Sequence, residues 1–287
     1  MKFFLFLLSL ILLSFSLYAN EEKFKIGIFQ KKLFATRKEA KIGAELWLKH
    51  MREKDEEFKM DMIFYEDEKK IIKDYISGKI SVVLFDATSY YKNKKTIDQL
   101  TDHKWIMSSS KGIFDKFYLI KNKKLKFELD DLKNKHIFYN DEMAKVWLDS
   151  LLYKNKRKKI DKKYIKTEKE NKLIFNVFFN KDDLSIISQD AYISMLELNP
   201  QIKQRIEIVS ESEAIFFNAI GFSRKNLSSK FENMIDLMRT KLVKKEKGFD
   251  VLSLVDIQKI YVLKENDLNK LDEFYKEYFF LKKKYRK

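Results

Sequence analysis

A run of hydroxyl-bearing residues offers the most explicit binding chemistry in this chain. Thr88, Ser89 and Tyr90 follow the apolar stretch 80–85 and stand where a helical pattern begins. A Thr or Ser hydroxyl at a helix start caps the helix and leaves backbone amides pointing outward, while a Tyr hydroxyl can donate or accept a hydrogen bond. Such a segment can hold a small polar ligand. An ordinary helix cap explains the same residues, and the two interpretations stay open.

The other candidate residues also follow predicted strands. Ligands of open α/β sheets bind outside the carboxyl ends of the strands, where helix starts converge. Asp86 and Asp190 suit a cationic or hydroxyl group of a ligand, or they cap helices, which is the favoured interpretation for Asp190. The candidate ligand-binding residues are Gln30, Asp86, Thr88, Ser89, Tyr90, Ser109, Tyr139, Asn140, Ser188 and Asp190.

Catalytic and metal-binding chemistry find little support in the sequence. Neither G-x-S-x-G nor H-E-x-x-H occurs, and the absence of Cys excludes thiolate metal sites and Cys nucleophiles. His50, His103 and His136 stand far apart in different contexts, which disfavours a metal site. We therefore expect no catalytic residue, no metal and no cofactor. Two other classes stay open: an exported enzyme that uses Asp86 or Asp190, and a surface-interaction protein whose own side chains fill the cleft.

The elements that must position the candidate residues follow from the hydrophobic pattern, which alternates short apolar runs with amphipathic stretches as in α/β proteins. A capping box at 36–39 predicts a helix behind it, and Gly78 suits the end of another helix. The expected strands are 24–29, 58–65, 80–85, 105–108, 114–121, 136–139, 184–187, 206–209 and 214–222. The expected helices are 66–77, a turn at 129–132, 141–153, 168–179, 190–198, 226–245 and 266 to the C-terminus.

This order predicts two α/β lobes with mainly parallel sheets, joined by extended crossovers. We expect lobe 1 to comprise residues 20–112 plus 220–287 and lobe 2 to comprise residues 113–219. The aromatic residues near the C-terminus recur at helical spacing, which predicts that the last helix docks onto a lobe.

The N-terminus predicts export. Lys2, the apolar run 3–17 and the small residue Ala19 are typical of a cleaved signal peptide over residues 1–19, and a retained membrane anchor is the weaker alternative because the run is short. We expect a soluble mature chain that begins near Asn20 and does not insert into the membrane.

The positive net charge of the chain indicates which kinds of partner are favoured. The chain has 59 Lys and Arg against 43 Asp and Glu, a net charge of +16. An exported protein rarely meets nucleic acid, so this charge favours an anionic ligand or an acidic membrane face, unless the lysines merely cover solvated surfaces. The lack of Cys means that the fold relies on its core without disulfides.

Four stretches resemble one known family: residues 76–86, 129–137, 183–192 and 197–202. Their order resembles that of type II periplasmic solute-binding proteins, specifically the phosphate, phosphite and phosphonate-binding (PhnD-like) family of ABC transporters. The resemblance implies a periplasmic, monomeric protein with a two-lobed periplasmic-binding-protein-like (type II) fold. It further implies that the lobes close over a small anionic, phosphonate- or phosphate-like ligand and present it to an ABC permease. A sensing subunit of a membrane histidine kinase is the alternative.

One departure from the family concerns the start of the second lobe. The family often places a hydroxyl- and Gly-rich oxyanion loop there, whereas residues 139–143 of this chain read Tyr-Asn-Asp-Glu-Met. The carboxylates of Asp141 and Glu142 compete with a bound anion for the positive end of the helix.

Overall fold

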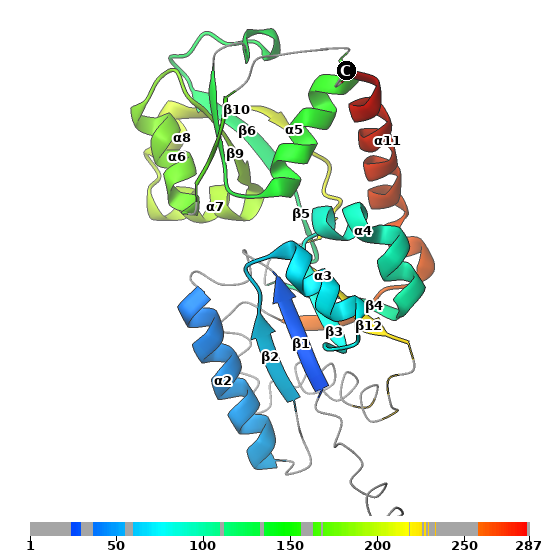
Figure 1. Cartoon of the computed structure of the whole chain (residues 1–287). Helices are drawn as coiled ribbons and strands as arrows, with labels where there is room; N and C mark the ends of the chain where they lie inside the picture. The colour runs from blue at the N-terminus through cyan, green and yellow to red at the C-terminus, as the bar shows by residue number, and fades with distance from the viewer. Residues whose placement is uncertain are drawn as a thin grey trace, which may run out of the picture.

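The chain forms two α/β lobes, stacked one above the other in Figure 1. The computed structural model describes residues 24–29, 37–54, 60–109, 112–132, 135–155, 163–167, 169–217, 219–225, 227, 229, 233 and 258–285. Among the expected features, Gln30, the signal peptide at 1–19 and nearly all of the helix at 226–245 lie outside the described residues. Within the described residues, no helix combines the length and the apolar character needed to cross a bilayer.

Lobe 1 is built on a six-stranded sheet in the order β13-β4-β12-β3-β1-β2. Its strands are β1 (Phe24–Phe29), β2 (Met60–Phe64), β3 (Val82–Phe85), β4 (Thr101–Ser108), β12 (Ile220–Arg224) and β13 (Lys259–Val262). Its helices are α2 (Arg37–Lys54), α3 (Glu68–Ile76) and α4 (Ala87–Leu100). Strand β1 runs parallel to β2 and β3, whereas β12 and β13 pair antiparallel with their neighbours.

Lobe 2 is built on a five-stranded sheet in the order β10-β6-β9-β7-β8. Its strands are β6 (Phe117–Asn122), β7 (His136–Tyr139), β8 (Lys163–Lys166), β9 (Leu184–Ser188) and β10 (Ile206–Glu211). Its helices are α5 (Glu142–Lys154), α6 (Glu170–Phe179), α7 (Gln189–Leu198) and α8 (Ile202–Arg205), with the short 3-10 helix η1 (Leu129–Leu132). Strand β7 is parallel to β8 and β9, and β6 is antiparallel to β9 and β10.

Two further features join the lobes. The chain passes between them through the paired strands β5 (Phe114–Asp115) and β11 (Phe216–Phe217). After the 3-10 helix η2 (Glu265–Leu268), helix α11 (Asn269–Tyr285) leaves lobe 1 and runs up beside α5 of lobe 2 (Figure 1).

The sequence predicted most of these elements, including the end of α3, where Gly78 adopts a left-handed φ of 76°. Both sheets are mixed rather than mainly parallel, because the strands that return from the crossovers enter them antiparallel. Strands β8 and β13 were missed because each is only four residues long, and β8 also carries Lys at both ends.

Packing fixes the sheets in register. Strand β3 is buried along its whole length, as its uninterrupted apolar sequence predicts for a central strand. Gly221 of β12 lies directly against the indole of Trp105 on β4, and a Cβ at this position would clash with that ring.

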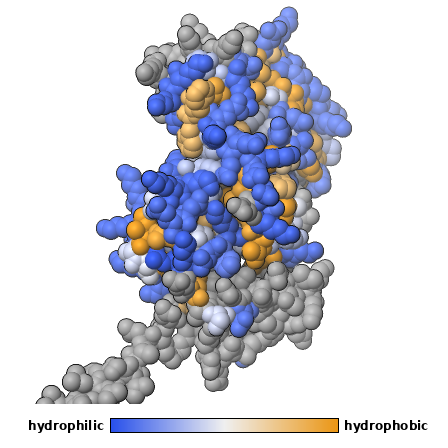
Figure 2. Space-filling view, turned by 90° about the vertical axis from the view of Figure 1, so that its right-hand side faces the viewer, coloured by the Kyte–Doolittle hydropathy of each residue, from blue (hydrophilic) through white to orange (hydrophobic). Residues whose placement is uncertain are grey.

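Figure 2 shows that the face of the molecule along α11 is mostly hydrophilic, with separate hydrophobic patches.

Candidate functional site

The sheet register places the predicted site residues of each lobe at one edge. In lobe 1, Phe29 lies beside Phe85 in the parallel pair β1–β3, so both strands end at the edge where Asp86 follows. In lobe 2, β7 and β9 are parallel, so the residues after Tyr139 and the residues after Ser188 also share an edge. Helices α4 and α5, which begin at these edges, contact each other. The starts of α4 (residues 86–90) and α5 (residues 139–143) therefore form a candidate site between the lobes.

Asp86 caps helix α4. Its carboxylate accepts a hydrogen bond from the backbone N–H of Ser89 at 2.8 Å and another from the Ser89 hydroxyl at 3.1 Å. Thr88 and Ser89 thus lie inside the first turn, and the prediction that one of them is the cap was wrong. The Asp86 carboxylate accepts the hydrogen bond from the helix-start N–H of Ser89, a role that was expected for a Thr or Ser hydroxyl.

The Asp86 carboxyl is unusually hard to ionise. Burial is the main cause that raises its pKa from 3.8 to about 6; the negative charges of Asp141 and Glu68 act in the same direction, and the hydrogen bonds from Ser89 oppose them. Asp141 belongs to lobe 2, so carboxylates from the two lobes act on each other across the candidate site.

The hydroxyl of Thr88 is engaged by the last helix. Its Oγ1 lies 2.8 Å from the hydroxyl of Tyr275 on α11, and both groups are buried. Burial raises the pKa of Tyr275 well above its usual value, and the charges of Asp86 and Asp141 raise it further. The Tyr275 hydroxyl therefore stays neutral and lies within the electrostatic reach of both helix starts.

The hydroxyl of Tyr90 is also engaged in internal contacts. It donates to Asp98 at 2.9 Å and accepts from Lys94 at 2.8 Å and Lys104 at 2.9 Å. Burial and the nearby Asp98 raise the pKa of Tyr90 far above its usual value. The three hydroxyls that the sequence offered as ligand groups thus all have partners inside the protein.

The start of α5 is polar and partly exposed. Asp141 caps the helix by accepting from the backbone N–H of Met143 at 2.8 Å, and Glu142 pairs with Lys166 at 2.6 Å. Burial acts to lower the pKa of Lys166, but the hydrogen bond and charge of Glu142 prevail and raise it. Asn140 is half-buried, and the buried Tyr139 packs edge-on against Tyr164. Two carboxylates therefore stand where the resembled family often has an oxyanion loop.

The remaining predicted residues have structural contacts. Ser188 caps α7 by accepting from the N–H of Ala191 at 3.3 Å, so Asp190, inside the first turn of the helix, is not the cap and that prediction was wrong. The Ser188 hydroxyl also lies 3.4 Å from Glu170. Ser109 donates from its hydroxyl to the carbonyl of Gly112 at 3.2 Å, and the two residues form an isolated antiparallel bridge before the crossover.

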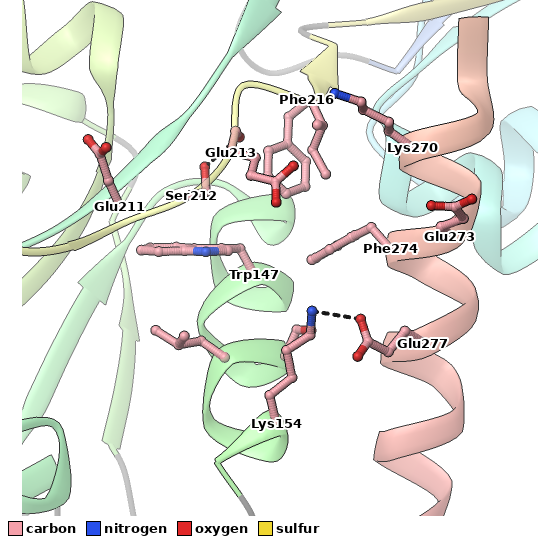
Figure 3. Close-up of a pocket in the computed structure, with 13 residues that line it drawn as sticks. Trp147, Lys154, Glu211, Ser212, Glu213, Phe216, Lys270, Glu273, Phe274 and Glu277 are labelled. Atoms are coloured by element: carbon pink, nitrogen blue, oxygen red, sulfur yellow. Dashed lines mark hydrogen bonds and ion pairs between the residues drawn. The ribbon is translucent and has the colours of Figure 1, made fainter. Parts of the chain in front are cut away.

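A separate cavity of about 370 Å³ lies away from the two helix starts, between α5, α11 and the crossover segment 211–216 (Figure 3). Phe274 projects from α11 toward α5, Trp147 lies on the side of α5 near Glu211 and Ser212, and Lys154 reaches Glu277. Sequence reasoning missed this feature because it arises where the C-terminal helix meets lobe 2, and only the aromatic spacing of the tail hinted at such docking. Across the described part of the chain, no group of three or more His, Asp or Glu side chains is arranged to hold a metal ion.

Comparison with known proteins identifies the fold. No protein-family model and no curated protein sequence matches the chain. Among solved structures, a binding protein component of an ABC phosphonate transporter from Pseudomonas aeruginosa has 16% identity and a TM-score of 0.62, covering 88% of this chain and 85% of that chain. PhnD1 from Prochlorococcus marinus, in complex with methylphosphonate, has 13% identity and a TM-score of 0.64, covering 90% of this chain and 98% of that chain.

A third solved structure is also matched over almost the whole of its own chain. A Xanthomonas citri protein solved bound to a chloride ion has 10% identity and a TM-score of 0.70, covering 91% of this chain and 98% of that chain. At these identities the similarity establishes the fold alone. The chain has the two-lobed fold of type II periplasmic binding proteins, as its sequence predicted.

Proposed function

We propose that this chain is a solute-binding protein that closes its two lobes over a small polar ligand and does not catalyse a reaction. The observation that carries this proposal is the contact between α4 and α5. The contact brings Asp86 of one lobe within electrostatic reach of Asp141 of the other lobe. A ligand that contacts both lobes stabilises the closed arrangement, and a partner can recognise that arrangement.

The ligand class follows from the charge at these helix starts. The resemblance implies a phosphonate- or phosphate-like anion, and the neighbours of the same fold include a phosphonate transporter component and a protein in complex with methylphosphonate. In this chain, however, an anion would meet Asp86 and Asp141, and the nearby hydroxyls of Thr88 and Tyr90 already have partners. We therefore propose a ligand that presents a cationic or hydrogen-bond-donating group to these carboxylates.

The location and the partner rest on the sequence and the fold. The apolar N-terminal stretch supports export to the periplasm, and the likeness to an ABC phosphonate transporter component supports an ABC permease as the membrane partner. A histidine kinase that reads the closed form is the alternative. The proposed lobe boundaries, after residues 112 and 219, and the monomeric state belong to the same proposal.

A thermal-shift screen of the chain from Asn20 onward tests the ligand class. The cationic probes are arginine, putrescine and choline, and the anionic probes are methylphosphonate, phosphate and sulfate. A ligand at about 100 times its dissociation constant adds about 2.7 kcal/mol of stability, which is a shift of several degrees. We expect a shift with a cationic probe that the double variant Asp86→Asn and Asp141→Asn abolishes.

A matched control separates this effect from a general change of charge. Asp182→Asn removes a carboxylate whose side chain is 87% exposed, and it should leave the shift intact. A shift with an oxyanion that persists in the double variant would contradict the ligand class and would leave the solute-binding role standing. The absence of a shift with every probe would count against binding of these solutes by the closed lobes.

A further inference from the structure

Helix α11 buries one of its faces and leaves the opposite face to solvent. Its buried residues are Leu271, Tyr275 and Tyr278, and the helix packs along α5 of lobe 2. Tyr153 on α5 stacks with both Tyr278 and Tyr285, with ring centroids 6.4 Å apart in each pair. The second half of α11 is thus held beside the end of α5. This packing confirms the prediction, made from the aromatic spacing, that the last helix docks onto a lobe.

The solvent-facing side of α11 combines lysines with an exposed aromatic ring. Lys276, Phe280, Lys283 and Lys284 are spaced by about one helical turn, so they lie on one side of the helix. The three lysines are exposed, and the Phe280 side chain is 64% exposed. We call these four residues the basic face of α11. Figure 2 shows the molecule from the side on which α11 lies, where hydrophilic side chains surround separate hydrophobic patches.

The positive charge of α11 is concentrated in its second half. Residues 276–285 contain four Lys and one Glu, whereas residues 269–275 contain one Lys, one Asp and one Glu. The one acidic residue of the second half, Glu277, pairs at 2.7 Å with Lys154, which belongs to α5 and not to the basic face. Lysines in the last turn of a helix also interact favourably with the helix dipole. The dipole explains their position, but it does not explain why the apolar ring of Phe280 is exposed among them.

We propose that the basic face of α11 is a docking surface for a bilayer with anionic phospholipid headgroups, on which the helix lies without crossing the membrane. The lysines attract the anionic headgroups. The ring of Phe280 enters the boundary between the headgroups and the acyl chains, as aromatic residues of interfacial helices do. Charge attraction and burial of one apolar ring thus act on the same face.

An acidic membrane is a partner that suits the positive net charge of the chain. The sequence favoured an anionic ligand or an acidic membrane face, and the carboxylates of Asp86 and Asp141 disfavour an anionic ligand. The basic face lies beside the end of α5, whereas the proposed ligand site lies at the start of α5. Membrane docking therefore goes beyond the proposed function, since it uses another surface and requires no ligand.

Co-sedimentation with lipid vesicles tests the docking surface. The chain from Asn20 onward, without ligand, is mixed with vesicles of phosphatidylcholine alone or with vesicles that also contain phosphatidylglycerol. We expect binding only to the vesicles that contain phosphatidylglycerol. Raising the salt concentration from about 0.1 M to about 1 M shortens the screening length from about 10 Å to about 3 Å, and it should lower the affinity at least about tenfold.

A first pair of variants tests the lysines. Lys276→Gln, Lys283→Gln and Lys284→Gln, combined in one chain, should weaken binding at least about tenfold, because each lysine near an anionic surface contributes about fivefold. The matched control removes three exposed lysines from α4, α6 and α8, and it should bind within about twofold of the natural chain, because salt screens charges far from the membrane. This control combines Lys95→Gln, Lys172→Gln and Lys203→Gln.

A second pair of variants tests the aromatic ring. Phe280→Ala removes the ring that enters the interface, and it should weaken binding about threefold or more without changing the salt dependence. Phe179→Ala on α6 is the matched control, because the Phe179 side chain is 70% exposed, and it should leave binding unchanged. Since both positions are exposed, both variants should keep the circular dichroism spectrum and the melting temperature of the natural chain.

Three outcomes would overturn the proposal. The absence of binding to vesicles that contain phosphatidylglycerol would exclude the membrane as the partner of the basic face. Equal losses of binding in the two triple variants would show that the overall charge of the chain, and not α11, attracts the vesicles. Equal binding of Phe280→Ala and the natural chain would exclude insertion of the ring. All of these measurements leave Asp86 and Asp141 unchanged and use no ligand, so they are independent of the thermal-shift screen.

Discussion

The starts of α4 and α5 occupy equivalent places in the two lobes, and they use their polar residues differently. At the start of α4, Thr88 and Tyr90 are buried, and each has a partner within lobe 1 or on α11. At the start of α5, Glu142 and its partner Lys166 are each about two-fifths exposed. One half of the candidate site is built into the core, whereas the other half keeps charged groups that solvent reaches.

The difference in burial indicates which half of the candidate site is rigid and which can adapt to a ligand. A buried, internally bonded helix start is rigid and costly to alter, because every polar group there must keep its partner. An exposed ion pair such as Glu142–Lys166 can exchange partners at little cost, although Asp141 beside it is buried. We therefore expect the α4 start to determine stability and shape, and the α5 start to adapt to the ligand.

The largest expected effect concerns Asp86. Asn retains the oxygen that caps α4 but cannot ionise, so Asp86→Asn should remove the cost of a buried charge. The pKa of Asp86 is raised from 3.8 to about 6, and one pKa unit corresponds to about 1.4 kcal/mol, so the unfolding free energy at pH 7 should rise by up to about 3 kcal/mol. Urea denaturation of the two chains measures the difference.

The same shift fixes the sign of the pH dependence. The folded state binds the Asp86 proton more tightly than the unfolded state does, so the contribution of this group to stability is largest below pH 4 and is lost as the pH rises through about 6. In Asp86→Asn this decline should disappear. A variant that is less stable than the natural chain at pH 7 would show that the carboxylate is needed in its charged form.

A smaller effect is expected for the hydrogen bond between Thr88 and Tyr275. Thr88→Val leaves the buried Tyr275 hydroxyl without its partner and should cost about 1–2 kcal/mol. Tyr275→Phe should cost a similar amount, because it leaves the buried Thr88 hydroxyl without this partner. A double-mutant cycle, measured by urea denaturation, should show that the two changes are not additive. Strict additivity would mean that the two hydroxyls do not support each other.

These two predictions show where sequence reasoning reached its limit. The sequence located the α4 start correctly, because a buried strand followed by Asp86 and three hydroxyl residues is a strong local pattern. It could not show that Tyr275, 187 positions from Thr88, fills the hydrogen-bonding capacity of that hydroxyl. Local spacing predicts helices and caps, whereas such a pairing depends on where the last helix packs.

The same limit explains the errors at the caps. Asp86 and Thr88 are both good cap residues, and only the backbone conformation at Asp86, with φ of −71° and ψ of 158°, decides between them. At α7, Ser188 and Asp190 posed the same choice, and Ser188 is the cap. A shift of two residues is within the usual uncertainty of helix boundaries, yet it changes which side chain is available to a ligand.

The smallest expected effect lies at the start of α5. Glu142→Gln removes the ion pair with Lys166, whose partners are 41% and 43% exposed, and it should change the unfolding free energy by less than about 0.5 kcal/mol. Glu197→Gln on the exposed face of α7 is the matched control, and both variants should melt within error of the natural chain in differential scanning calorimetry. Added salt should reduce any remaining difference, because it screens exposed charges. A loss comparable to that of Thr88→Val would mean that the fold depends on the α5 start as strongly as on the α4 start, and the contrast between the two halves of the site would fail.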